Sequence, residues 1–255
     1  MNSIEKRLLE LNRLQDLQQR SHWMNDLHPL GKLLISVIYI SFVTSIDKYS
    51  VVPLILMSLY IIFTFIIGDL SFKEGLYRMR LVLPLVVFVG VFNPFLDKST
   101  VMIGDFAVRG GLVSMITLFI KGLYTVLAVY ALIATTSIDD ICYALRTIHI
   151  PKTIVIVIML IYRYVDVMAG EADRIYTAYK LRAPGQKGIE YRSWGTLVGQ
   201  WLLRSMDKAR IVYESMLLRG FRGDFITKKK SIRIIDVIYP MIWLIVFLYV
   251  RLFVK

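Results

Sequence analysis

The feature that most constrains this chain is a series of apolar blocks separated by short charged connections. A helix that spans a membrane needs about 20 largely apolar residues, with a range near 17 to 25. The blocks lie at about 33–47, 50–68, 81–96, 111–134 and 238–254. The first and third are short, so each would draw on flanking residues to cross a bilayer. The sequence predicts an all-α integral membrane protein with about five transmembrane helices.

The distribution of charge supports this class and indicates an orientation. The chain is 56% hydrophobic and carries a formal net charge of +12, and its charges lie mostly between the apolar blocks. Cytoplasmic connections of membrane proteins are enriched in Lys and Arg. Both the segment before the first block and the connection at Arg78 and Arg80 are basic, which predicts a cytoplasmic N-terminus. Five spans would leave the C-terminal tail outside, which fits the same rule poorly.

The first 31 residues are expected to form a cytosolic amphipathic leader. Ile4, Leu8 and Leu11 belong to an apolar stripe that recurs every three or four residues. Such a helix either lies on the membrane surface, with its basic side chains towards the headgroups, or packs on the cytosolic part of the protein. The segment is too polar for a secretory signal, so the first apolar block is expected to remain as a span.

The stretch 135–230 is densely basic and reads as three helices in a cytosolic domain. The short first helix starts at Ser137, a good N-cap residue. The second starts at Pro151, runs to about Arg182 and has an apolar front half that is too short to span, at about ten residues. The third covers about 192–218. The expected divisions of the chain are 1–31, 32–134, 135–230 and 231–255.

The third of these helices carries the clearest periodic pattern in the chain. One side is apolar or small along its length at a period of 3.6 residues. The other side carries charges spaced for i,i+3 and i,i+4 pairs. The helix is therefore expected to pack on something apolar. The residues that define this apolar face are Trp194, Trp201, Leu202, Met206, Ala209 and Tyr213.

Residues that could support catalysis or bind a metal are scarce. The three histidines form no pair at metal-ligand spacing, and the single Cys142 is expected to be a small apolar filler. Asp139 and Asp140 are adjacent, so they face different directions on a helix and are expected to favour its start. No phosphate-binding loop ending in Gly-Lys-Ser/Thr occurs. We expect no catalytic residues, no metal site and no enzymatic activity.

Two of the predicted helix ends place arginine beside small residues. One is "AYKLRAPG", with Arg182, and the other is "LLRGFRG", with Arg219 and Arg222 expected on one helical face. Gly220 and Gly223 would end the helix or admit a close partner. Guanidinium groups stay charged and bind carboxylates or carbonyls as a fork. These ends either dock on another protein or contact lipid phosphates or the chain's own carbonyls. A nucleic-acid partner is not expected, because exposed aromatic residues are not interleaved with the basic charge.

The order of these parts resembles the transmembrane T component of energy-coupling factor transporters, the cobalt-transport Q protein family. The resemblance extends from about "LHPLGKLL" to the last span, which is nearly the whole chain. It includes the short matches "FNPF" and "TTSIDDICYAL". Its two specific stretches are "IPKTIVIVIMLIYRYVDVMAGEADRI" and "LLRSMDKARIVYESMLLRGFRGDF".

In that family, two cytosolic helices each end in a short Ala-Arg-Gly motif that docks on one of a pair of ATP-binding cassette (ABC) ATPases. Arg219 and Gly220 match the second motif, with leucine in place of its alanine. In the first motif, which falls on Leu181, Arg182 and Ala183, only the arginine matches. The resemblance thus implies an ATPase-docking role for Arg182, Ala183, Leu218, Arg219, Gly220 and Arg222.

The resemblance also implies a function. The chain would be the coupling subunit of an ATP-driven micronutrient transporter, for a metal ion such as cobalt or for a vitamin, in a prokaryotic cell membrane. Two ABC ATPases, identical or not, would bind ATP and Mg, and a membrane S component would bind the substrate, so this chain would bind no cofactor. The alternative is a self-sufficient secondary carrier or channel. That class is typified by polar groups at the membrane midplane and internal repeats, and the sequence indicates neither.

Overall fold

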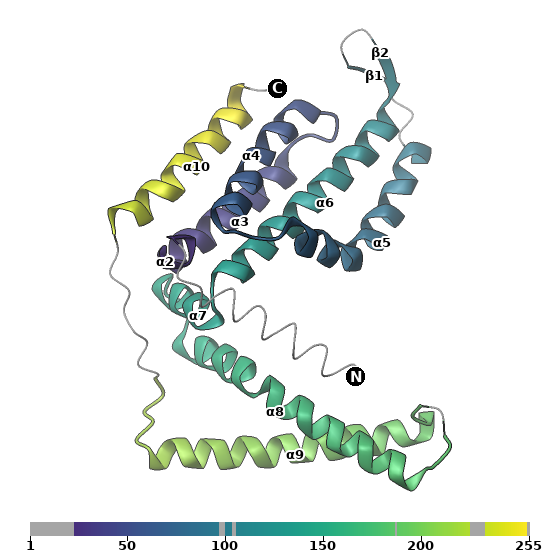
Figure 1. Ribbon diagram of the computed structural model, residues 1–255, viewed down its shortest axis with the longest axis vertical. Helices are drawn as coiled ribbons and strands as arrows, with labels where there is room; N and C mark the ends of the chain where they lie inside the picture. Colours follow the sequence, from purple (N-terminus) through teal and green to yellow (C-terminus); the bar gives the residue numbers. More distant parts are fainter. Residues whose placement is uncertain (1–22, 97–99, 104–105, 187, 225–232, 254–255) are drawn as a thin grey trace. The chain divides into compact units, whose positions relative to one another are not determined.

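The computed structural model describes residues 23–96, 100–103, 106–186, 188–224 and 233–253 (Figure 1). Of the predicted leader 1–31, residues 1–22 lie outside these ranges; the remainder forms α2 and the first residues of α3, and its Met24 and Leu27 are buried in the core. The described chain divides into two compact units. We call residues 23–144 with 233–253 the bundle unit, and residues 145–224 the two-helix unit.

The bundle unit is built from helices that pack around α3 and α6. α3 contacts α6 and α10, α4 contacts the same two helices, and α5 pairs with α6. The elements are α2 (Trp23–Asp26), α3 (Pro29–Ser45), α4 (Val51–Ile67), α5 (Phe72–Leu96), β1 (Thr100–Ile103), β2 (Phe106–Arg109), α6 (Gly110–Thr135) and α10 (Ile234–Phe253). α7 (Ile138–Thr147) continues the chain from α6 into the two-helix unit.

The connection between α5 and α6 departs from the all-α prediction. β1 and β2 form an antiparallel hairpin in which Thr100 lies opposite Arg109 and Ile103 lies opposite Phe106. The two strands are only four residues each, so the apolar-block pattern used to assign the fold could not detect them.

The structure supports a multi-pass membrane protein, but not a count of five spans. Among the described helices, α6, α10 and α8 (Lys152–Arg182) are long and apolar enough to cross a membrane. α4 and the first part of α5, Phe72–Arg80, qualify together as a fourth candidate, although they are bent by 120°. α3 and the segment Val82–Pro94 are shorter apolar helices. α8 is long enough because its apolar stretch continues beyond Arg163, whereas the prediction limited that stretch to about ten residues.

An aromatic cluster holds α3, α4 and α10 together. The ring centroids of Tyr39 and Tyr60 are 4.5 Å apart, and those of Tyr60 and Trp243 are 5.0 Å apart with the rings nearly perpendicular. Phe247 lies 5.4 Å from Tyr39. All four side chains are buried. Such tilted and edge-to-face contacts add to the stabilisation that burying the rings provides.

Two lysines from the bundle close the ends of neighbouring helices. Lys32, in the first turn of α3, is buried, and its Nζ donates to the backbone oxygen of Thr135 at the end of α6 over 2.8 Å. Lys121 of α6 donates in turn to the backbone oxygens of Thr44 and Ile46 at the end of α3. Carbonyl groups at helix C-termini have no partner within their own helix, and a cation there also complements the helix dipole.

Asp236 accepts hydrogen bonds at two helix starts, whereas the two lysines donate hydrogen bonds at helix ends. Its carboxylate accepts from the backbone N–H of His28, before α3, over 2.7 Å, and from that of Arg233, before α10, over 2.8 Å. The residue is buried, and α10 begins at Ile234, earlier than the predicted 238. A Cβ at Gly31 would lie 3.1 Å from the backbone oxygen of Asp236, so the two helices approach closely here.

Replacing Asp236 by asparagine should lower the stability of the bundle unit. The amide can accept from one N–H group but presents its NH2 to the other, which leaves a buried donor unsatisfied at a cost of about 1–3 kcal/mol. The measurement is the midpoint of thermal unfolding in detergent, with Asp26→Asn, an exposed aspartate of α2, as the control. Equal midpoints for the two variants would contradict this role of Asp236.

Candidate functional site

The two-helix unit consists of two long helices that cross, α8 and α9 (Tyr191–Leu218) (Figure 1). The bounds of α9 agree closely with the predicted 192–218. Pro151 is the N-cap of α8 and not its first helical residue, and its backbone oxygen accepts from the N–H of Ile154. The predicted N-cap of α7 is confirmed, since the Ser137 hydroxyl accepts from the N–H of Asp140 over 3.1 Å.

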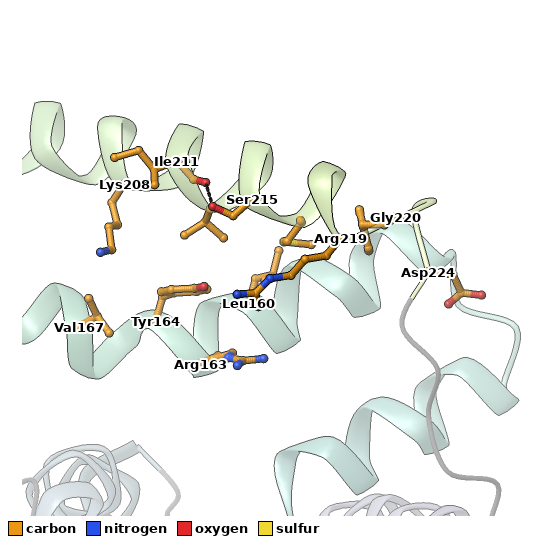
Figure 2. A pocket seen from close by; sticks show the side chains of 13 residues that line it. Leu160, Arg163, Tyr164, Val167, Lys208, Ile211, Ser215, Arg219, Gly220 and Asp224 are labelled. Atoms are coloured by element: carbon orange, nitrogen blue, oxygen red, sulfur yellow. Dashed lines mark hydrogen bonds between the residues drawn. The ribbon is translucent and has the colours of Figure 1, made fainter.

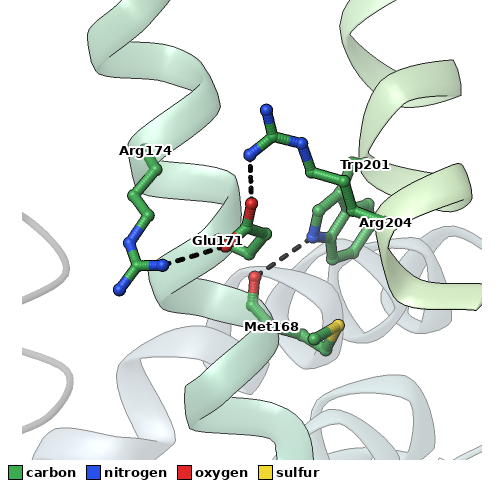
Figure 3. A network of polar contacts seen from close by, with 5 residues as sticks. All are labelled: Met168, Glu171, Arg174, Trp201 and Arg204. Atoms are coloured by element: carbon green, nitrogen blue, oxygen red, sulfur yellow. Dashed lines mark hydrogen bonds and ion pairs between the residues drawn. The ribbon is translucent and has the colours of Figure 1, made fainter. Parts of the chain in front are cut away.

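Side chains at the crossing join α8 to α9 (Figure 3). The indole N–H of Trp201 donates to the backbone oxygen of Met168 over 3.1 Å. The Glu171 carboxylate accepts from Arg204 of α9 and, over 3.3 Å, from Arg174 on its own helix. Trp201, one residue of the predicted apolar face of α9, therefore lies at the contact between the helices.

The remainder of that predicted face is largely uncovered within the described chain. α9 contains no buried residue. All six residues of the face are exposed, and Trp201 remains so even at the crossing: Trp194, Trp201, Leu202, Met206, Ala209 and Tyr213. α8 therefore covers α9 where the two helices cross, and not along the whole predicted face. A large exposed apolar surface of this kind is typical of a surface that contacts another protein or a membrane.

The end of α9 is a glycine-terminated cap centred on Arg219. Gly220 has φ +79°, and its N–H donates to the backbone oxygen of Leu217 over 2.9 Å. The N–H of Phe221 reaches back to Met216 over 3.0 Å. This pair of bonds is the Schellman motif, which needs a left-handed residue that glycine adopts readily. Arg222 lies beyond the cap, so the expectation that it shares a helical face with Arg219 is wrong: the chain leaves the helix at Gly220.

α8 also ends at an exposed arginine. Arg182 is its last residue, and Ala183 follows as the C-cap, with its N–H donating to the backbone oxygen of Tyr179 over 3.1 Å. The Tyr179 hydroxyl also accepts from the N–H of Glu190, which holds the start of α9 beside the end of α8. Both predicted arginines thus lie at helix C-termini, where positive charge is favourable.

The structure does not bring the two predicted docking ends together. Arg182 is near the start of α9 and Arg219 is at its end. α9 has 28 residues. At a rise of 1.5 Å per residue its ends lie about 40 Å apart. The two arginines therefore lie far apart, one near each end of α9.

An open cleft of about 680 Å³ lies between α8 and α9 near Arg219 (Figure 2). Its aliphatic lining includes Leu160 and Met216, and its cations are Arg163, Lys208 and Arg219. In Figure 2 the Arg219 side chain extends from α9 across to Leu160 of α8. The Arg219 side chain therefore lies along the cleft.

One further charged contact was not anticipated from the sequence. The Arg146 guanidinium donates to both carboxylate oxygens of Asp224, each over 2.8 Å, and Lys152 Nζ lies 3.5 Å from the same carboxylate. Burial by itself would raise the pKa of Asp224, but Arg146 and then Lys152 lower it below its usual range. Arg146 and Asp224 are 78 residues apart in the chain, so helical spacing gives no signal for their contact.

Neither a grouped set of metal ligands nor an exposed cysteine is found among the described residues. Within the described ranges, no three His, Cys, Asp or Glu side chains are grouped so that they could hold a metal ion. Cys142 is fully buried, in keeping with its predicted role as a small apolar filler, and burial raises the pKa of its thiol.

Comparison with known proteins identifies the family. The model of the CbiQ cobalt transport protein family matches residues 20–232. A fused cobalt transport protein CbiMQ of Methanocorpusculum labreanum is 26% identical over 81% of this chain, which spans only 35% of that longer protein. The uncharacterized protein MJ1089 of Methanocaldococcus jannaschii is 25% identical over 76% of this chain and 72% of its own length.

The family match confirms the resemblance to the cobalt-transport Q proteins that the sequence indicated. It covers the described membrane helices of the bundle unit, except α10, together with the whole described part of the two-helix unit. The chain therefore belongs to the CbiQ cobalt transport protein family, as a membrane transport component and not an enzyme.

Proposed function

We propose that the chain is the coupling subunit of an ATP-driven uptake transporter in a prokaryotic cell membrane, with its N-terminus in the cytoplasm. It passes movement from two ABC-type ATPases, identical or not, to a separate membrane subunit that binds the substrate. That substrate is a micronutrient, cobalt or another metal ion or a vitamin. ATP and Mg are bound by the ATPases and not by this chain.

The observation that carries this proposal is the pair of arginine-ended helices in the two-helix unit. α8 ends at Arg182, and α9 ends at the cap formed by Arg219 and Gly220. Because the two ends are about 40 Å apart, a single small ligand cannot bind both, whereas two protein partners can. An exposed arginine at a fixed helix end is suited to recognise a carboxylate or a group of carbonyls in a groove.

The local backbone around Arg219 suits close approach of a partner. An atom built at the Cβ position of Gly220 would meet nothing within 4 Å, so the space beside Arg219 is open. The left-handed backbone there disfavours any other residue. A partner can therefore contact the main chain of the cap as well as the guanidinium group.

The crossing of α8 and α9 offers a way to convert partner movement into a common displacement. Trp201, Glu171 and Arg204 join the two helices where they cross. Displacing one arginine end therefore moves the other helix as well, and α7 carries the displacement along the chain to α6. We propose that the exposed apolar face of α9, from Trp194 to Tyr213, contacts the substrate-binding subunit or membrane lipid.

This proposal places both long helices on the cytoplasmic side, although α8 is apolar enough to span. The apolar part of α8 is followed by a highly charged second half, and α9 carries charges along one side. A spanning α8 would carry α9 to the outer side of the membrane. The side on which α9 lies therefore distinguishes the two arrangements.

A cysteine introduced by Gln200→Cys, at an exposed position of α9, should be protected in right-side-out vesicles. A membrane-impermeant maleimide is expected to label it only after the membrane is permeabilised. Lys48→Cys, in the turn that the N-terminal orientation places outside, is the positive control, and the buried Cys142 of the unaltered chain is the blank. Labelling of Gln200→Cys in intact vesicles would overturn the cytoplasmic placement.

Replacing Arg219 by alanine should weaken assembly with the ATPases. The chain is expressed with a tag together with its neighbouring genes, and the ATPases that co-purify in mild detergent are quantified. Losing a charge-assisted anchor worth about 1.5–3 kcal/mol should reduce affinity by roughly 10- to 100-fold. Uptake of substrate should fall in parallel while the thermal stability of the chain stays the same.

Arg210→Ala is the matched control, because Arg210 is an exposed arginine on the same helix, away from its end. Equal recovery of ATPases with both variants would remove Arg219 as the anchor. If the unaltered chain recovers no ATPase at all, the coupling role itself fails and a self-sufficient carrier becomes the better account.

A further inference from the structure

We infer that the ion pair between Arg146 and Asp224 is a tether that positions the end of α9 against the corner where α7 leads into α8. The tip of α9 is defined here as residues 218–224. That the tether matters for ATPase coupling rests on the proposed function; that it holds the tip is a property of this chain alone. Arg146 and Asp224 are thus proposed as positioning residues for Arg219.

The geometry of the contact is suited to fixing an orientation. Both oxygens of the Asp224 carboxylate are bound by the two terminal nitrogens of Arg146, each over 2.8 Å. A fork of this kind defines direction as well as distance, unlike a single point contact. Lys152, at the start of α8, adds a second cation at 3.5 Å. The tip of α9 is thereby connected to the last turn of α7 and the first turn of α8.

The tip needs such a contact because its own backbone does little to restrain it. After the cap at Gly220, the chain runs without helical hydrogen bonds to Asp224. Gly220 and Gly223 both have positive φ, +79° and +75°, and glycine is the residue with the widest backbone freedom. An atom at the Cβ position of either would meet nothing within 4 Å, so the space beside these two residues is open.

The tether also decides which arginine Asp224 binds. Arg219 and Arg222 are close to Asp224 in the sequence and could compete for its carboxylate. Figure 2 shows the Asp224 carboxylate directed away from Arg219, whose side chain lies over the cleft beside Leu160. By engaging Asp224, Arg146 keeps this neighbouring carboxylate from neutralising Arg219. The guanidinium of Arg219 therefore remains available to a partner.

The tether further shortens the route by which movement of the tip travels. α7 begins shortly after α6 ends, and Arg146 lies in its last turn. A displacement of the α9 tip can therefore reach α7, and along the chain α6, through one ion pair. It need not pass along the full length of α9 and back along α8.

The first test measures amide hydrogen exchange of the purified full chain without partners. Asp224→Asn and Arg146→Gln should each raise exchange in the peptide covering 216–224 by about two- to fivefold, as expected for loss of a partly exposed ion pair. Asp224→Glu, which keeps the carboxylate, should restore most of the protection. Arg174→Gln, which removes another arginine ion pair of the same unit, should leave this peptide unchanged.

The second test uses the complex with ATPases and substrate-binding subunit. The complex with Asp224→Asn should still contain the ATPases but transport less substrate per ATP hydrolysed. Asp224→Glu should restore the amount of substrate transported per ATP. Unchanged exchange in both tether variants would overturn the tether, whether or not ATPases bind. Raised exchange with unchanged transport per ATP would overturn its positioning role. Failure of the unaltered chain to bind ATPases would overturn the proposed function while leaving the exchange result valid.

Discussion

The bundle unit depends on closing its helix ends with buried and half-buried charged side chains. Backbone groups at helix termini have no partner within the helix, and a membrane interior has no water to supply one. Lys32 and Lys121 donate to carbonyls at the ends of α6 and α3. Asp236 accepts from N–H groups at the starts of α3 and α10. These charged groups are therefore bonded to backbone groups at helix ends of the bundle unit.

The two units differ in how much of their apolar surface they bury. The bundle unit buries its aromatic and aliphatic side chains around α3, α4, α6 and α10, which makes it a stable anchor. The two-helix unit leaves most of its apolar surface exposed and places arginine at each of its ends. A large exposed apolar surface is typical of a surface that contacts another protein or a membrane.

The sequence predicted the elements whose signals are local and periodic. The bounds of α9 followed from its 3.6-residue pattern, and the start of α7 followed from Ser137. The number of spans could not be predicted from the sequence. Hydropathy alone allows α8 to be either a membrane span or a cytosolic helix, and α4 bends sharply into α5. Contacts between distant residues, such as Asp236 with His28 or Asp224 with Arg146, have no local signature. The direction of Arg222 was missed because the left-handed backbone at Gly220 turns the chain out of the helix.

The central claim is that this chain couples ATP hydrolysis to transport by another subunit and does not transport by itself. The most direct measurement is uptake of radiolabelled Co²⁺, the substrate named by the family, into proteoliposomes. The chain alone is compared with the chain reconstituted with its ATPases and substrate-binding subunit. The account predicts no uptake by the chain alone, with or without an ion gradient, and ATP-dependent uptake by the full assembly. Gradient-driven uptake by the chain alone would contradict it.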